Sequence, residues 1–291
     1  MRACLLLVAL ALLSACTTID VPECCPAAAQ PTRLVSEQIR ICSLNIAHGR
    51  ANSFNQMFVS KQKFLGNLDA LSELLLQINP DIAALQEVDA PSRWSGKFNH
   101  LDYIRNKTGW SEYIHGEHQQ GWASSFGTAI VSQHDLQGEH SHSFQPSFPS
   151  TTKGFVTATI DWQLPEQTVT LTVFSVHLDF FRRKVRQAQI DELSDYIRKI
   201  SGPVVIAGDF NGEWTDKDSA VYELIEELNL KAFQPDADNL GTYKKTSGKR
   251  LDWILISQDL EFADYSVAPE KISDHLAVVA DIIYLPVQPG D

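Results

Sequence analysis

The chain has 291 residues, of which 44% are hydrophobic, and a formal net charge of −12 at pH 7. This apolar content supports a substantial core and excludes a disordered or low-complexity protein. The acidic balance also disfavours a protein that holds long polyanions by bulk positive charge.

The N-terminal segment predicts export and lipid attachment. A short basic start, MRA, precedes the apolar run 5–13, which is too short to span a bilayer and is typical of a secretory signal. The next residues, LSAC, end at Cys16 and resemble the lipobox of bacterial lipoproteins, where cleavage precedes the cysteine and its thiol carries lipid. We therefore expect residues 1–15 to be a signal peptide and Cys16 to be lipidated. Loss of Arg2 would leave a formal charge of −13, and Thr17 suggests the outer membrane, facing the periplasm.

The segment after the lipidation site is predicted to be a flexible tether over residues 16–36. It has no hydrophobic periodicity and contains three prolines and an alanine run. Cys24 and Cys25 lie within it, and the sequence assigns them no role. Cys42 lies in the next predicted strand and is expected to be a buried, inert thiol.

From residue 39 the chain alternates strands and helices without an internal repeat or linker, which predicts one domain over 37–286. Strands are predicted at 39–46, 82–86, 127–132, 154–162, 168–176, 204–207, 250–256 and 275–284, and helices at 64–78, 185–200 and 221–228. Segments 88–126 and 133–153 are interpreted as loops. The mixture of long antiparallel strands and helices indicates an α/β protein, with two sheets packed on each other and helices outside.

Polar residues interrupt the apolar runs at the ends of these strands. They are Asn45 in SLNIAHG, Glu87 in ALQEVD, His177 in SVHLD, Asp209 and Asn211 in GDFN, Asp252 in RLDWI, and Asp274 and His275 in SDHLAV. One acid after a strand is usually a turn or a helix cap. Six such stretches with carboxylate, amide and imidazole groups instead indicate a common site.

The ordered motifs LN, QE, SVH, GDFN, LD and SDH resemble those of the endonuclease/exonuclease/phosphatase superfamily. This superfamily includes deoxyribonucleases, abasic-site endonucleases, neutral sphingomyelinases and inositol polyphosphate phosphatases. The resemblance extends from Asn45 to His275 and implies a four-layer α/β/β/α sandwich of two packed mixed sheets, with the site at the sheet edge.

Phosphoester hydrolysis explains why these residue types are needed. A phosphodiester anion repels nucleophiles, so the reaction needs a cation on its oxygens, an activated water and donors for the developing charge. Glu87 is a hard oxygen ligand of the kind that Mg²⁺ or Mn²⁺ prefers. The family pattern implies that Asn45 and Asp274 lie beside it.

The same resemblance implies the remaining catalytic roles. Asp209 would align or deprotonate the attacking water, and Asn211 would hold the phosphate or that water. His275 would donate to a non-bridging oxygen with Asp252 supporting its imidazole, and His177 would donate from the opposite side.

Several other residues have weaker signals. Arg182, Arg183 and Arg186 begin a helix just after His177, where cations oppose the helix dipole, and are candidate phosphate-binding residues. His48 and Lys153 could reach the site but are not assigned to it. The histidines of segments 111–120 and 133–143 fit no regular zinc spacing and are expected in loops.

The sequence predicts a monomeric, Mg²⁺- or Mn²⁺-dependent hydrolase of phosphoric esters, with no protein partner indicated. Lipid-linked or small-molecule phosphodiesters at the cell envelope are the favoured substrates because of the acidic chain and its anchor. DNA or RNA cleavage by an endonuclease or exonuclease is an alternative, since one basic cluster lies beside His177. A catalytically idle binding lipoprotein is a second alternative, and the complete motif set argues against it.

The lipobox resemblance gives the first testable prediction. Cys16→Ser should move the protein from the membrane fraction to the soluble fraction, because no other segment of the sequence has the length to hold it in a bilayer. Fractionation of cells followed by immunoblotting measures this. A Cys42→Ser variant is the matched control and should stay with the membranes. A Cys16→Ser protein that still sediments with membranes would show that a cleft or surface patch binds lipid directly.

Overall fold

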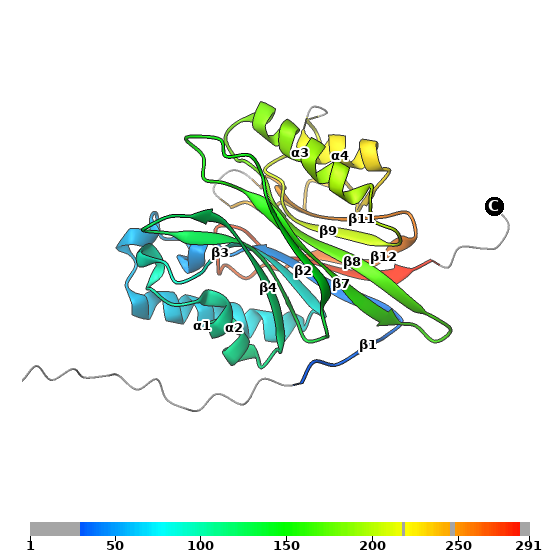
Figure 1. The fold of residues 1–291 in the computed structure, drawn as a ribbon, viewed down its shortest axis with the longest axis horizontal. Coiled ribbons are helices and arrows are strands. Elements are labelled where there is room, and N and C mark those ends of the chain that lie inside the picture. Colours follow the sequence, from blue (N-terminus) through cyan, green and yellow to red (C-terminus); the bar gives the residue numbers. More distant parts are fainter. Residues whose placement is uncertain (1–29, 217–218, 245–247, 286–291) are drawn as a thin grey trace, which may run out of the picture.

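The computed structural model describes residues 30–216, 219–244 and 248–285 and shows two mixed β-sheets packed face to face. Helices cover the outer face of each sheet, which gives the order α/β/β/α (Figure 1). The four-layer sandwich expected from the sequence is therefore confirmed.

The first sheet has six strands in the order β12-β13-β2-β3-β5-β4. Their bounds are β2 Gln38–Asn45, β3 Ile82–Asp89, β4 Glu112–Gln120, β5 Ser125–Ser132, β12 Leu260–Val267 and β13 Val278–Tyr284. Helices α1 (Lys61–Ile78) and α2 (His100–Thr108) cover its outer face (Figure 1). The Ser60 side chain accepts a hydrogen bond from the Lys63 amide and caps the start of α1.

The second sheet has seven strands in the order β1-β7-β8-β9-β11-β10, with β6 pairing to β7. Their bounds are β1 Leu34–Val35, β6 Gln137–Ser143, β7 Gly154–Gln163, β8 Thr168–His177, β9 Val204–Asp209, β10 Lys231–Ala232 and β11 Asp252–Ile256. Helices α3 (Arg183–Ile197) and α4 (Ala220–Leu228) cover this sheet (Figure 1).

Three apolar layers hold the sandwich together. The central layer joins the facing sides of the two sheets and contains Trp162, Ile254 and Val278. The two outer layers pack each sheet against its own pair of helices. Strands buried on both faces need apolar side chains on both, which explains continuous runs such as 204–207.

Parallel pairing brings the carboxyl ends of the central strands to one edge. Strands β2 and β3 run parallel in the first sheet, and β8 and β9 run parallel in the second. His177 is paired in register with Asp209, and Asp252 pairs with Asp209 from the antiparallel strand β11. The strand pairing therefore assembles polar residues that lie far apart in the sequence.

The structure corrects several sequence predictions of local structure. The segments interpreted as loops, 88–126 and 133–153, contain α2, β4 and β6, and the strand β12 was missed. Strands β4 and β6 have few long apolar residues and depend on neighbouring strands for pairing, so propensity alone did not reveal them. Four of the histidines expected in loops lie in these two strands, at positions 115, 118, 140 and 142. Asp252 opens its strand and His275 precedes β13, whereas both were placed at strand ends.

The N-terminal boundary of the fold lies before residue 36. Strand β1 pairs in parallel with the far end of β7, where Leu34 lies opposite Trp162. Leu34 is buried in the central layer, so the end of the predicted tether belongs to the fold. Cys16, Cys24 and Cys25 lie outside the described residues.

Two further expectations concern Cys42 and membrane spans. Cys42 is a free thiol buried in β2, as predicted, and burial raises its pKa to about 12. Within the described residues, no helix combines the length and hydropathy needed to cross a bilayer.

Candidate active site

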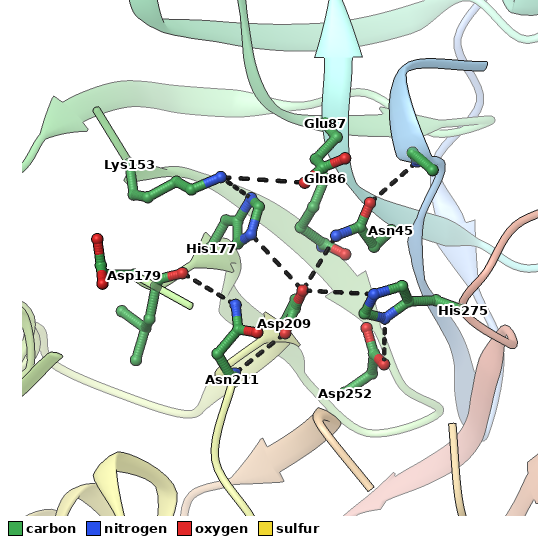
Figure 2. Close-up of polar contacts among 12 residues, drawn as sticks. Asn45, Gln86, Glu87, Lys153, His177, Asp179, Asp209, Asn211, Asp252 and His275 are labelled. Carbon is green, nitrogen blue, oxygen red and sulfur yellow. Dashed lines mark hydrogen bonds and ion pairs between the residues drawn. The ribbon is translucent and has the colours of Figure 1, made fainter. Parts of the chain in front are cut away.

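The polar residues predicted from the strand ends gather around one cavity of about 510 Å³ at the sheet edge. The predicted residues in its wall are Asn45, Glu87, His177, Arg186, Asp209, Asn211, Asp274 and His275. Figure 2 shows most of these side chains converging from different strands and loops. Asp252 lies behind this wall, fully buried.

Asp209 is the central group of the cluster. Its Oδ2 accepts a hydrogen bond of 3.0 Å from the Asn45 amide and lies 3.6 Å from His177 Nε2 and 3.9 Å from His275 Nε2 (Figure 2). Its Oδ1 accepts a bond of 3.0 Å from the backbone N–H of Asn211. Burial raises the pKa of Asp209, although the charge of His275 and the Asn45 hydrogen bond oppose this rise. The two sheets thus surround one carboxylate with donors.

Close packing of β8 on β9 sets the position of this carboxylate. The residue before Asp209 is Gly208, and a Cβ built there would lie 2.0 Å from the Val176 carbonyl oxygen. A side chain at this position would push the two parallel strands apart. The glycine of the GDFN motif is therefore needed to hold Asp209 beside His177.

His275 is supported as a cation. Its Nδ1–H donates a bond of 2.8 Å to Asp252 Oδ2, and the Thr242 hydroxyl donates to the same oxygen at 2.6 Å. Burial alone would lower the pKa of His275, but the carboxylates of Asp252 and Asp209 outweigh burial and raise it. The imidazolium therefore persists at neutral pH and points Nε2–H toward the cavity.

His177 has the opposite electrostatic environment. The Lys153 ammonium lies 3.4 Å from its Nδ1, which makes Nδ1 the acceptor and leaves the proton on Nε2. Burial lowers the pKa of His177 well below its usual value, and the charge of Lys153 lowers it further. The site thus holds a neutral and a charged imidazole on two sides of Asp209.

Glu87 enters the cavity through an irregularity in β3. The register of β3 with β5 shifts between Gln86 and Val88, and Glu87 has a φ of 54°. A positive φ is strained for a residue with a Cβ and is typical of functional positions. The buried Gln86 amide meanwhile donates to Ser175 Oγ at 3.1 Å and fixes the strand between the sheets. The kink separates Glu87 from the regular alternation of β3.

Cations surround the Glu87 carboxylate. His48 Nε2 lies 3.3 Å from Oε2, and Lys153 Nζ lies 3.9 Å from Oε1. Burial would raise the pKa of Glu87, but these two groups and the site histidines hold it below its usual range. His48 also donates through Nδ1 to the buried Asp89 at 2.8 Å, and this bond orients its ring.

The third predicted metal ligand approaches from the chain segment before β13. Asp274 Oδ2 accepts a bond of 3.0 Å from Arg50, and the Asp274 side chain lies in the same cavity wall as Glu87. The Ser273 hydroxyl donates to the Asn45 carbonyl at 2.7 Å, which joins this segment to the end of β2.

Two groups of side chains carry atoms of the kind that can bind a divalent cation. Among the described histidines, cysteines and acids, one group of three has ligand atoms within 4.8 Å of one another: Asp209, Asp252 and His275. In this group the cation is His275 itself, because its imidazolium is bonded to Asp252 and lies beside Asp209. The oxygen donors of Glu87, Asn45 and Asp274 lie in the cavity wall and suit a hard cation better.

The predicted arginines are divided by the structure. Arg186 lies in the cavity wall and donates to the Asp179 carbonyl at 3.0 Å. Arg182 instead donates to the Ser147 carbonyl in the loop before β7, and Arg183 is not in the wall. Arg182 is the residue before α3 and has an extended backbone, so its side chain is not oriented by the helix that carries Arg186.

Some residues of the site were not assigned to it from the sequence. Arg50, Phe180, Tyr243, Lys249 and Leu251 complete the cavity wall. Arg50 and Lys153 lie within four residues of a motif or strand start, which was a usable signal. Thr242 had none, since its contact with Asp252 depends on a loop packing against β11.

Comparison with known proteins gives a family match over most of the chain. A model of the endonuclease/exonuclease/phosphatase family matches residues 42–275. A UPF0294 protein of Yersinia enterocolitica is 29% identical over 102 residues, which are 35% of this chain and 36% of that protein. A UPF0294 protein of Klebsiella pneumoniae is 29% identical over 102 residues, or 35% of each chain. The chain therefore spans about a third of the length of these curated relatives.

Solved structures share the fold at low sequence identity. A protein of the same family from Leptotrichia buccalis has a TM-score of 0.65 at 18% identity, covering 84% of this chain and all (100%) of that one. The human nocturnin catalytic domain with a bound sulfate anion has a TM-score of 0.62 at 18% identity, covering 88% and 96% of the two chains. TDP2 from C. elegans gives 0.59 at 19% identity, covering 87% and 77%.

The support of His275 by Asp252 can be measured directly. Asp252→Asn should lower the pKa of His275 by about 1 unit or more, because it removes the carboxylate that opposes the desolvation of the imidazolium. Titration of the His275 ring signals by NMR measures this. Asp161→Asn, which removes an exposed carboxylate on β7, is the control and should leave that pKa unchanged. An unchanged His275 titration in Asp252→Asn would show that another group holds the proton.

Proposed function

The chain belongs to the endonuclease/exonuclease/phosphatase family, and we propose that it is a divalent-metal-dependent phosphodiesterase acting on lipid-linked or small-molecule substrates at the cell envelope. The observation that carries the proposal is the placement of Asp209 between a charged and a neutral imidazole at the sheet edge. This arrangement supplies an acceptor for a water proton and two donors for phosphoryl oxygens in one cavity.

Asp209 is the residue that acts on the water. Its carboxylate is held at two points, by the Asn45 amide on Oδ2 and the Asn211 backbone on Oδ1, so it cannot rotate away. Burial raises its proton affinity toward the range that suits a general base at neutral pH. Asn211 has its side-chain N–H bonded to the Leu178 carbonyl, which leaves its amide oxygen to position the water or the substrate.

The two histidines donate to the oxygens on which charge develops. His275 does so as an imidazolium, and His177 does so through the Nε2–H that Lys153 leaves in place. Donors that are fixed before the reaction stabilise the transition state without a reorganisation cost. In this proposal the phosphate lies between the two donors, in line with the water that Asp209 holds.

Glu87, with Asn45 and Asp274, is the proposed site for Mg²⁺ or Mn²⁺. The kink that turns Glu87 into the cavity and the hard oxygen donors around it support this assignment. When bound, the cation supplies positive charge next to the phosphoryl oxygens. Lys153 and His48 balance the Glu87 carboxylate in its absence.

The overall charge supports a small or lipid-linked substrate over long nucleic acid. The chain has a formal charge of −12, whereas nucleases draw much of their affinity from displacing counterions with basic surfaces. Arg186 in the cavity wall provides a positive charge for one phosphate group. The nocturnin catalytic domain, which shares this fold, was solved with a sulfate anion, and this supports anion binding in the present chain. An anchor at Cys16 would keep the cavity near envelope lipids.

Two substitutions test the catalytic assignment. Asp209→Asn and His275→Ala should each lower kcat for a soluble phosphodiester on the order of 100-fold or more, because they remove water activation and a charged donor. Initial rates with bis(p-nitrophenyl) phosphate and thermal unfolding curves measure activity and folding separately. His142→Ala, which breaks a surface contact with Glu192, is the control and should keep wild-type activity. A larger loss in His142→Ala than in the other two would place the site elsewhere.

A substrate comparison tests the function as a whole. With Mg²⁺ at physiological salt, we expect a higher kcat/KM on phospholipid or sugar-phosphate diesters than on plasmid DNA. Chelator should abolish hydrolysis, and Mg²⁺ or Mn²⁺ should restore it, because the phosphate otherwise meets uncompensated acids. The Asp209→Asn protein, purified in parallel, controls for contaminating enzymes. Activity that survives excess chelator contradicts the metal, and efficient DNA nicking that falls steeply with salt contradicts the substrate class.

A further inference from the structure

Exposed hydrophobic side chains gather on one set of loops. Among the described residues, large hydrophobic side chains with high exposure are Phe54, Met57, Phe58, Trp122, Phe148, Phe180 and Phe181, with Val35 and Leu76 as the remaining two. Phe54 is 96% exposed and Phe148 is 91% exposed, so neither contributes to the core. Exposure of several phenyl rings without core contacts is costly in water and indicates a binding surface.

All of these side chains except Val35 and Leu76 lie on four loops that follow or precede the strands of the active site. Segment 46–60 follows β2, and segment 178–182 follows β8. Segment 121–124 joins β4 to β5 beside the end of β3, because Phe126 pairs with Asp89. Segment 144–153 joins β6 to β7, whose first residue, Gly154, pairs with His177. Strand pairing therefore places all four loops at the edge that carries the cavity.

We call these four loops, together with segment 90–99 after β3, the edge loops. Arg93 of segment 90–99 lies 5.4 Å from the ring of Trp122 and donates its backbone N–H to Ala123, which joins two of the loops. Phe180 forms part of the cavity wall. One of the exposed rings therefore lies directly beside the active site, and Phe181 contacts it with ring centroids 6.1 Å apart.

The edge loops have a charge opposite to that of the whole chain. They contain five basic residues, Arg50, Arg93, Lys97, Lys153 and Arg182, and one acid, Asp179. Asp179 is fully buried and accepts hydrogen bonds from the backbone of Phe181 and Arg182. The next two residues, at the start of α3, are also basic. On the other side of the cavity, Glu213 is paired with Lys249. Lys153 is buried beside Glu87 and Arg50 pairs with Asp274, so the exposed positive charge comes mainly from Arg93, Lys97 and the two basic residues at the start of α3. An acidic chain therefore presents basic and aromatic side chains around its site.

We propose that the edge loops dock the active-site edge onto the surface of an anionic phospholipid bilayer. The inference rests on the proposed function and assigns its substrate class to phospholipid headgroups reached at the membrane surface. Aromatic rings partition favourably into the boundary between headgroups and acyl chains, and basic side chains pair with anionic headgroups. The cavity then opens toward the layer in which the phosphodiester lies.

A bilayer fits this surface better than a nucleic acid strand. Stacking on bases needs rings arranged along a groove that follows a backbone, with basic residues alongside. Here the aromatic rings lie on separate loops around the cavity. The exposed side chains also include Met57, which has no ring to stack on a base. Phenyl groups form no conventional hydrogen bonds and a thioether sulfur accepts only weakly, and insertion into lipid requires no hydrogen bond.

The position of β1 is compatible with this orientation. Strand β1 pairs with the end of β7 that lies opposite to Gly154, so the chain enters the fold away from the edge loops. Leu34 follows Cys16 by 18 residues, a length that reaches at most about 60 Å. The ten residues of β7 span about 33 Å. A chain anchored at Cys16 can therefore turn its edge loops to the membrane.

Vesicle binding without turnover tests this surface independently of catalysis. The chain from residue 16 onward, carrying Cys16→Ser to remove the anchor, is sedimented with phosphatidylcholine vesicles that contain phosphatidylglycerol, without divalent metal. The combined variant Phe54→Ser, Phe58→Ser and Phe148→Ser should bind about 10-fold more weakly or worse, because three inserted rings are lost. The control variant Val35→Ser and Leu76→Ser removes exposed apolar groups elsewhere and should bind like the parent. Thermal unfolding confirms that all three proteins are folded.

The outcomes separate the docking surface from the catalytic proposal. Binding that weakens with salt and with the three phenylalanine changes supports the surface, whatever the hydrolysis assays give. Parent protein that stays in solution, or equal binding by the two variants, overturns it. Loss of binding to a single-stranded oligonucleotide in the phenylalanine variant, with no vesicle binding by the parent, would overturn it in favour of base stacking.

Discussion

The rest of the site depends on one buried carboxylate. Asp209 lies where the two sheets meet, 2% exposed, and an isolated charge there would be strongly disfavoured. The protein compensates with donors from four different segments: the Asn45 amide, the Asn211 backbone and the two imidazoles. Each donor is in turn held by a further group, such as Asp252 behind His275. Burial of one acid therefore requires an ordered polar network, and that network is what the proposed chemistry uses.

Parallel strand pairs make this network possible. In both sheets the central strands end at the same edge, so loops that leave them converge while the strands themselves stay buried and apolar. Two local features then adjust individual residues: the kink at Glu87 and the close contact at Gly208. Both features concern the backbone. Without the kink, the regular alternation of β3 would place Glu87 on one of the packed faces of the sheet. The same strands thus need apolar side chains for packing and local backbone adjustments, at Glu87 and Gly208, for the site.

Local charge distribution matters more here than net charge. The chain is acidic overall, but the edge loops contain a single acidic residue, the buried Asp179. Screening limits exposed charges to an effective range of about 8 Å at physiological salt, so a ligand at the edge responds to the nearby arginines and lysines. The proposed preference for an anionic surface follows from this segregation.

The sequence by itself determined the fold class and the set of polar residues, because each motif lies next to an apolar run whose identity is local. Asn45, Glu87, His177, Asp209, Asn211, Asp274 and His275 were all named from their positions, and the structure brings them into one cavity wall. Only the tertiary structure decided which groups touch. It paired Lys153 with His177 and Thr242 with Asp252, separated Arg186 from Arg182, and showed that β4 and β6 are strands. These features depend on contacts between residues far apart in the sequence, and a local pattern carries no information about which distant partner will neutralise a charge or complete a sheet.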